Sequence, residues 1–138
     1  MPIRVYFQDT DAGGVVFHAT YLAFLERART EWLRALGFDQ GVLTERFGVI
    51  FIVRGLEVAF LKPAVLDDLV MVSARAAKVG RAQLTMAQEV RRGDELLLRA
   101  SVNLACVGRR DFRPSALPAP VLGALAPHID RPYSVEEA

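Results

Sequence analysis

The sequence predicts an α+β protein in which one long amphipathic helix lies on a single antiparallel sheet of five strands. Apolar residues recur every three or four positions between Ala19 and Leu36, which is the period of a helix with one buried face. From Gly48 onward apolar residues alternate with polar ones, which is the period of strands with one buried face. An apolar helix stripe and an apolar sheet face bury each other when the helix packs on the sheet.

The composition fits one globular domain. The chain has 138 residues, of which 52% are hydrophobic, enough to form a buried core. Its net charge of +1 argues against nucleic acid as the main partner, because phosphate binding usually needs a basic excess. The single cysteine, Cys106, lies in a strand-like run and is expected in the core. No secretory signal or membrane-spanning stretch is visible, so we expect a cytoplasmic protein.

The first strand and the long helix follow from local patterns. Residues 3–7, IRVYF, are β-branched and aromatic and predict a strand. The helix is expected over Ala19–Leu36, and Gly37 is a natural stop after it. One further short helix is expected within residues 39–48. The face of the long helix that should meet the sheet carries Tyr21, Leu25, Ala28, Trp32 and Leu36.

Four antiparallel strands are expected after the helices. Residues 78–83, KVGRAQ, and residues 91–95, RRGDE, are typical of tight hairpin turns. The predicted apolar faces include Leu56, Val58 and Phe60 in one strand, then Leu84, Met86, Gln88 and Val90, then Leu98, Ala100, Val102 and Leu104. Such a sheet leaves an open edge, and dimerisation through that edge would cover it.

The composition changes after Phe112, because five of the seven prolines lie between positions 114 and 132. We therefore expect one domain over residues 1–112 and a proline-rich tail over residues 113–138. The proline content predicts that this tail is extended or partly disordered.

The loop before the long helix, QDTDAGGVVFHATY at residues 8–21, carries the candidate chemistry. Gly13 and Gly14 allow a backbone to approach a ligand closely. The first N–H groups of a helix have no partner within the helix, and they favour an oxygen that is becoming negative. The carboxylate of Asp11 beside such a pocket suits acyl transfer, either as nucleophile or as the base for a water. No cluster has the spacing of metal ligands, so no metal or cofactor is expected.

A structural role explains the same loop equally simply. Asp9, Thr10 and Asp11 are residue types that cap turns and helices. His18 suits the first turn of a helix with a structural hydrogen bond. Residue types and spacing alone leave both interpretations open.

A resemblance adds to these patterns. Residues 4–37, RVYFQDTDAGGVVFHATYLAFLERARTEWLRALG, resemble the signature of hotdog-fold acyl-CoA thioesterases. The similarity is to the 4-hydroxybenzoyl-CoA thioesterase family and, within it, to the YbgC-like branch associated with the Tol–Pal system. FIVRGLEVAFLKPAVLDDLVMV, VGRAQLTMAQEV and LLLRASVNLACV continue it, so that it covers about residues 2–112.

The resemblance implies a sheet curled round one central helix, a homodimer or homotetramer, and hydrolysis of acyl-CoA to a free acid and CoA. It implies that Asp11 is the catalytic carboxylate and that the backbone N–H near His18 polarises the thioester carbonyl, with the His18 ring as a possible further participant. The substrate-binding residues that it or their position suggests are Gly14, Val15, Val16, Phe17 and Tyr21 around the acyl group, and Lys62 and Arg81, with Lys78, Arg109 and Arg110, for the CoA phosphates.

Two other functions are compatible with the sequence. A hotdog-fold enoyl-thioester hydratase also uses a carboxylate and a histidine, although Asp11 and His18 are seven apart and the loop typical of that branch is absent. A non-catalytic module that binds acyl-CoA or acyl-carrier protein is the third candidate. The branch also suggests a link to Tol–Pal or acyl-carrier-protein partners.

Overall fold

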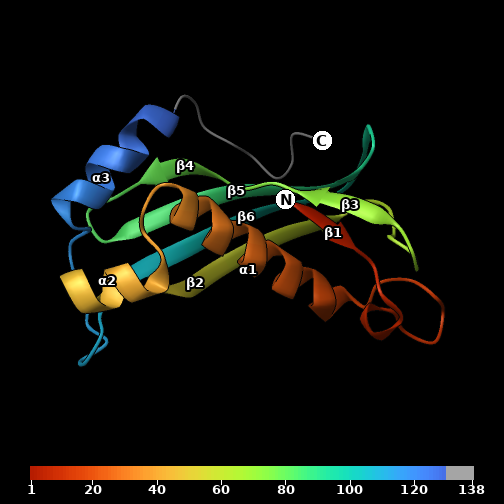
Figure 1. The fold of residues 1–138 in the computed structure, drawn as a ribbon, viewed down its shortest axis with the longest axis horizontal. Coiled ribbons are helices and arrows are strands. Elements are labelled where there is room, and N and C mark those ends of the chain that lie inside the picture. Colours follow the sequence, from red (N-terminus) through yellow and green to blue (C-terminus); the bar gives the residue numbers. More distant parts are fainter. Residues whose placement is uncertain (130–138) are drawn as a thin grey trace.

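The computed structural model describes residues 1–129 of the chain. Short 3₁₀ turns are labelled η. In chain order the elements are β1 (Pro2–Arg4), η1 (Phe7–Asp9), α1 (His18–Ala35), α2 (Gln40–Phe47), β2 (Val49–Phe60), β3 (Leu69–Val72), β4 (Arg75–Val79), β5 (Gln83–Arg92), β6 (Glu95–Gly108), α3 (Ala119–Leu125) and η2 (Ala126–His128) (Figure 1).

The strands form one antiparallel sheet in the order β1-β3-β5-β6-β2, and β4 also pairs with β5. This confirms the predicted helix-on-sheet class, but the sheet has six strands instead of five. The extra strand arises because the strand before the hairpin turn at 78–83 is interrupted at Ser73, and both halves pair with β5. Ser73 keeps the link between β3 and β4 hydrogen-bonded to β5. Its N–H donates to the Glu89 carbonyl at 2.9 Å, and its Oγ accepts the Glu89 N–H at 3.1 Å.

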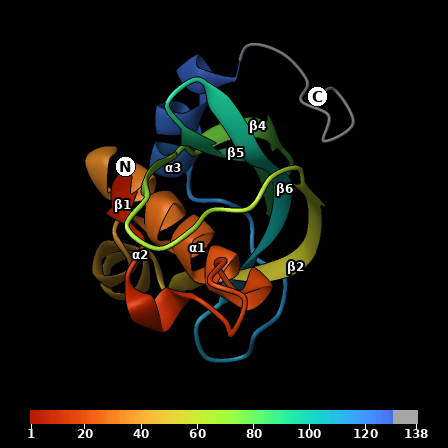
Figure 2. The same cartoon turned by 90° about the vertical axis from the view of Figure 1, so that its right-hand side faces the viewer.

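The sheet curls around α1, which Figure 2 shows nearly end-on inside the curve. The start of the helix is one residue earlier than predicted and its end one residue earlier as well. Tyr21, Leu25 and Ala28 are buried as expected, and Phe24 and Leu33 join them. Burying each large apolar side chain stabilises the fold by about 1.5–3 kcal/mol. Gly37, with φ of 95°, takes the left-handed conformation that ends the helix.

Two predicted elements differ at their ends. The first strand covers only Pro2–Arg4, because the chain from Phe7 to Asp9 turns into η1. The short helix is confirmed as α2, where the Asp39 side chain accepts the Val42 N–H at 2.9 Å as an N-cap.

The expectation of an extended chain after Phe112 was wrong for Ala119–Leu125, which form α3. Pro118 is the N-cap and Pro120 lies in the first turn, where a missing N–H removes no helix hydrogen bond. Val121 and Leu125 are fully buried in the core cluster that also contains Leu84 and Cys106, as predicted for the cysteine. Residues 130–138 of the predicted tail lie outside the described part.

The strand β2 forms one edge of the sheet. Its predicted apolar face is only partly covered within one chain: Val58 packs against the core, but Leu56 is 40% and Phe60 54% exposed, and Ile52 and Val53 are exposed as well. A strand edge with free backbone groups and apolar side chains is a surface on which another strand can pair. No helix within residues 1–129 is long and apolar enough to cross a membrane.

Candidate functional site

The loop that carries Asp11 is a tight turn closed by its own backbone. The Asp11 N–H donates to the Val15 carbonyl at 2.9 Å, the Gly14 N–H donates to the Asp11 carbonyl at 3.0 Å, and Thr10 pairs with Val16. Gly14 has φ of 78°, a conformation that side chains other than glycine rarely adopt. The Asp11 side chain is exposed, and its Oδ1 accepts the Gly13 N–H at 2.8 Å. Within residues 1–129 no hydrogen bond involves Oδ2, so one carboxylate oxygen is available to a ligand or water.

Asp9 and Thr10 shape the turn. The Asp9 Oδ2 accepts the Tyr6 N–H at 2.8 Å, and the Thr10 hydroxyl donates to the Phe7 carbonyl at 2.7 Å. The Asp9 carbonyl accepts the Phe17 N–H at 3.0 Å and so joins the turn to the start of α1. Each of the two aspartate side chains accepts one backbone N–H, but Asp9 is half-buried whereas Asp11 is exposed.

The start of α1 has unused donors. Its N-cap, Phe17, offers no side-chain cap, and the Thr20 N–H turns back to the Phe17 carbonyl at 2.9 Å. In the described chain, no acceptor lies within hydrogen-bond distance of the N–H groups of His18 and Ala19. The exposed His18 ring lies 4.4 Å from the Phe17 ring, centroid to centroid. Free donors at a positive helix end favour an oxygen that carries negative charge.

A second loop, residues 61–68, is hydrogen-bonded to the loop that carries Asp11. The Val16 N–H donates to the Ala64 carbonyl at 2.9 Å, and Val15 pairs with Val65. The Tyr21 hydroxyl accepts the Ala64 N–H at 2.9 Å. Tyr21 is only 4% exposed, and burial raises the pKa of its phenol against the opposing effect of that hydrogen bond. Tyr21 thus holds α1 to the 61–68 loop, a structural role that the sequence did not predict.

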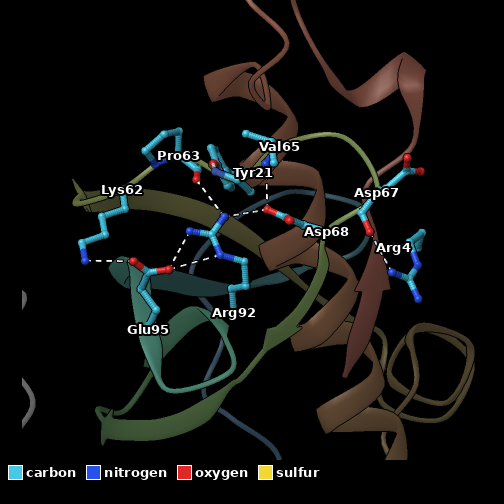
Figure 3. A network of polar contacts seen from close by, with 10 residues as sticks. Arg4, Tyr21, Lys62, Pro63, Val65, Asp67, Asp68, Arg92 and Glu95 are labelled. Atoms are coloured by element: carbon cyan, nitrogen blue, oxygen red, sulfur yellow. Dashed lines mark hydrogen bonds and ion pairs between the residues drawn. The ribbon is translucent and has the colours of Figure 1, made fainter.

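Of the five basic residues predicted for CoA, Lys62 and Arg81 lie far apart within one chain. Lys62 is in the 61–68 loop, where its Nζ forms an ion pair with Glu95 at 2.9 Å. Glu95 in turn pairs with Arg92, and Arg92 pairs with Asp68 (Figure 3). Arg81 lies in the β4–β5 turn, where its carbonyl accepts the Leu117 N–H next to α3. Figure 1 shows that this end of the sheet is opposite to the Asp11 loop. The structure therefore gathers the predicted residues from Asp11 to Tyr21, with Lys62 nearby, and leaves Arg81 apart.

A cavity that the sequence did not predict lies between α1, α2 and the β2 edge. Its volume is about 350 Å³, and its lining is mostly apolar, with Leu33, Leu43 and Phe51 among the walls. Arg29 reaches its side from α1, and burial lowers the pKa of this guanidinium. Its Nη1 donates to Gln88 Oε1 at 3.0 Å. Cavities of this kind depend on how elements pack, so no local sequence signal would have found it.

Metal binding has no candidate site among residues 1–129, because no three His, Cys, Asp or Glu side chains come together there.

Comparisons with known proteins show which family this chain resembles. A sequence profile of the thioesterase superfamily matches residues 13–99. The acyl-CoA thioesterase YbgC of Haemophilus influenzae is 45% identical over 123 residues, which are 89% of this chain and 90% of that protein. The acyl-CoA thioester hydrolase YbgC of Escherichia coli O6:H1 is 42% identical, over 88% of this chain and 90% of that protein.

Solved structures share the fold. A probable thioesterase from Bartonella henselae superposes with a TM-score of 0.81 at 36% identity, covering 86% of this chain and 97% of that chain. A hypothetical protein from Thermus thermophilus superposes with a TM-score of 0.86 at 30% identity, covering 93% and 97% of the two chains.

Proposed function

We propose a mechanism for this chain, which belongs to the thioesterase superfamily and hydrolyses an acyl-CoA thioester to a free carboxylic acid and CoA. In this mechanism Asp11 drives the attack on the thioester, and the N-terminus of α1 binds the carbonyl oxygen. The observation that carries the residue roles is that the loop holding the exposed Asp11 carboxylate leads directly into α1, whose first two N–H groups are unused within residues 1–129. A thioester needs little acid assistance, because its thiolate is a good leaving group.

The carbonyl oxygen of the substrate accepts hydrogen bonds from the N–H groups of His18 and Ala19. Attack on the carbonyl carbon moves negative charge onto this oxygen, so these donors act most strongly in the transition state. Collapse of the tetrahedral species breaks the C–S bond and releases CoA. Gly14 has nothing within 4 Å of the position where a Cβ would be, and the open space over this glycine leaves room for the thioester.

Asp11 has two chemically distinct ways to act. As a base it takes a proton from a water that attacks the carbonyl; as a nucleophile it attacks directly and forms an anhydride that water then opens. A single turnover in ¹⁸O-water tests for the anhydride. Label in the Asp11 carboxylate identifies the anhydride route, whereas label only in the product acid is expected both for direct attack by water and for an anhydride opened at the acyl carbon.

The acyl group is expected to lie against Val15 and Phe17, which are partly exposed, whereas Val16 and Tyr21 form a buried layer behind them. Hydrolysis of a panel of acyl-CoAs, followed by release of the free thiol, tests the function. No hydrolysis of any aliphatic or aromatic acyl-CoA, combined with tight binding, would instead support a binding module, and hydration of crotonyl-CoA would support a hydratase.

The same proposal includes a homodimer that pairs β2 with β2 of a second copy. The exposed apolar side chains of Ile52, Val53, Leu56 and Phe60 on an edge strand support it. Antiparallel pairing places the beginning of one β2 beside the end of the other. Arg109, whose N–H binds the Gly48 carbonyl just before β2, then comes from the second copy to the Lys62 end of the first and offers a cation to the CoA phosphates. A tetramer, a cytoplasmic location and Tol–Pal or acyl-carrier-protein partners stay predictions from the sequence.

A further inference from the structure

The 61–68 loop, which supports the loop that carries Asp11, is attached to the rest of the fold at several points. Its first residues bind β6, since the N–H groups of Leu61 and Lys62 both donate to the Leu97 carbonyl. Its last residues bind the chain after β1, where Asp67 and Asp68 exchange backbone hydrogen bonds with Val5. Between these two attachments, Ala64 binds Val16 and Tyr21, and the residues beside it have further partners.

One arginine side chain reaches this middle part from β5. Arg92 Nη1 donates to Asp68 Oδ2 at 2.7 Å and to the Pro63 carbonyl at 3.3 Å (Figure 3). Its Nε and Nη2 donate to the same oxygen of Glu95, at 3.2 and 2.6 Å. These four hydrogen bonds fix the orientation of the planar guanidinium, so that Arg92 connects the β5–β6 turn to the 61–68 loop.

A continuous series of hydrogen bonds and backbone pairings leads from Arg92 to Asp11. The Asp68 Oδ2 that binds Arg92 also accepts the Val65 N–H at 2.9 Å. Val65 pairs with Val15, and the Val15 carbonyl accepts the Asp11 N–H at 2.9 Å. The neighbouring carbonyl of Ala64 accepts the Val16 N–H, two residues before α1 begins.

We propose that Arg92 is a positioning residue for the hydrolysis: by holding the 61–68 loop it fixes Val15 and Val16, and so the position of Asp11 relative to the N–H groups at the start of α1. The inference rests on the catalytic roles in the proposed function. Displacing a catalytic group by about 1 Å through a remote change lowers a rate by up to ~100-fold. Arg92 itself does not touch the reacting atoms.

The variant Arg92→Met removes the hydrogen bonds and keeps most of the apolar stem. We expect kcat to fall at least ~10-fold while KM changes less than ~3-fold, because the Michaelis complex still forms but its reacting groups are displaced. Arg92→Lys keeps the charge and restores part of kcat. The matched control is Arg91→Met: the adjacent arginine binds Glu89 and the Asp94 carbonyl instead, and we expect kcat within ~2-fold of wild type.

Two further measurements distinguish positioning from a general loss of stability. In Arg92→Met, hydrogen–deuterium exchange of peptides covering residues 9–17 becomes faster, whereas in Arg91→Met it stays as in the wild type. Combined with Asp11→Asn, Arg92→Met lowers the residual rate by much less than it lowers the wild-type rate, because Arg92 acts through Asp11.

The proposal is overturned if Arg92→Met matches Arg91→Met in both kcat and exchange, if its effect adds fully to that of Asp11→Asn, or if only KM rises. Should Arg92→Met fail to fold, Arg92→Gln, which also removes the charge, takes its place with the same criteria. If the wild type hydrolyses no acyl-CoA, the proposed function fails, and the exchange experiment still decides whether Arg92 holds the Asp11 loop.

Discussion

Replacing Tyr21 with Phe removes one hydrogen bond and almost nothing else. The Tyr21 hydroxyl accepts the N–H of Ala64, a residue with no exposed surface, at 2.9 Å. The ring keeps its packing against Phe24 and Phe60, whose centroids lie 6.2 and 5.8 Å away. A buried N–H left without an acceptor costs about 1–3 kcal/mol of unfolding free energy. For a chain of 138 residues this lowers the melting temperature by about 3–9 °C.

Thermal unfolding, at equal protein concentration for Tyr21→Phe and wild type, measures this loss, and acyl-CoA kinetics measure KM in parallel. Because the hydroxyl is occupied by Ala64, we expect KM to change less than ~2-fold. Burial raises the pKa of the Tyr21 phenol, so its contribution to stability is complete below the ordinary pKa of 10.0 and is lost as the pH rises through the higher folded value. A variant of unchanged stability but much higher KM would refute the structural role and return Tyr21 to the substrate site.

Three other changes have defined outcomes. Glu95→Gln should be less stable than the wild type at pH 7, because hydrogen bonds from the cations of Lys62 and Arg92 lower the Glu95 pKa to about 2. The difference in stability should disappear as the pH falls from about 4.5 through about 2, and urea unfolding at several pH values measures it. Gln88→Leu should cost about 2–4 kcal/mol in the same assay, because this buried amide donates to the carbonyls of Leu25 and Ser73 and accepts from Arg29; a loss below about 1 kcal/mol would contradict it. Val53→Asp should convert a dimer to a monomer by light scattering, and an unchanged mass would exclude β2 as the interface.

The elements that the sequence predicted well are those with a long, regular period. The α1 helix and the buried faces of β5 and β6 follow directly from apolar spacing, and the helix ends differ from the prediction by one residue. The break at Ser73 was not predictable in this way, because Leu69–Val72 is apolar throughout and has no alternation to interrupt, and the interruption depends on contacts with β5. The α3 helix was missed because proline content suggested an extended chain, although prolines at a helix start are compatible with it.

The candidate site was predictable where it is contiguous in sequence. The loop from Asp11 to His18 carries its own signals: a carboxylate, two glycines and a helix start. The contacts that hold it were not, since Ala64 and Val65 reach it from a distant loop, and Arg92 binds that loop from β5. Lys62 looked like a phosphate ligand by position, yet it already pairs with Glu95. Charge and position alone do not say which cations are already occupied.

The most direct test of the account is kcat for the best acyl-CoA substrate with Asp11→Asn, beside Asp9→Asn as the matched control in the same loop. The half-buried Asp9 binds the Tyr6 N–H in the turn, whereas the carboxylate of Asp11 is exposed. We predict a fall of about 10²- to 10⁴-fold for Asp11→Asn with the melting temperature nearly unchanged, and a fall of less than about 10-fold for Asp9→Asn. Full activity of Asp11→Asn, or equal losses in the two variants, would contradict the assignment of the chemistry to Asp11.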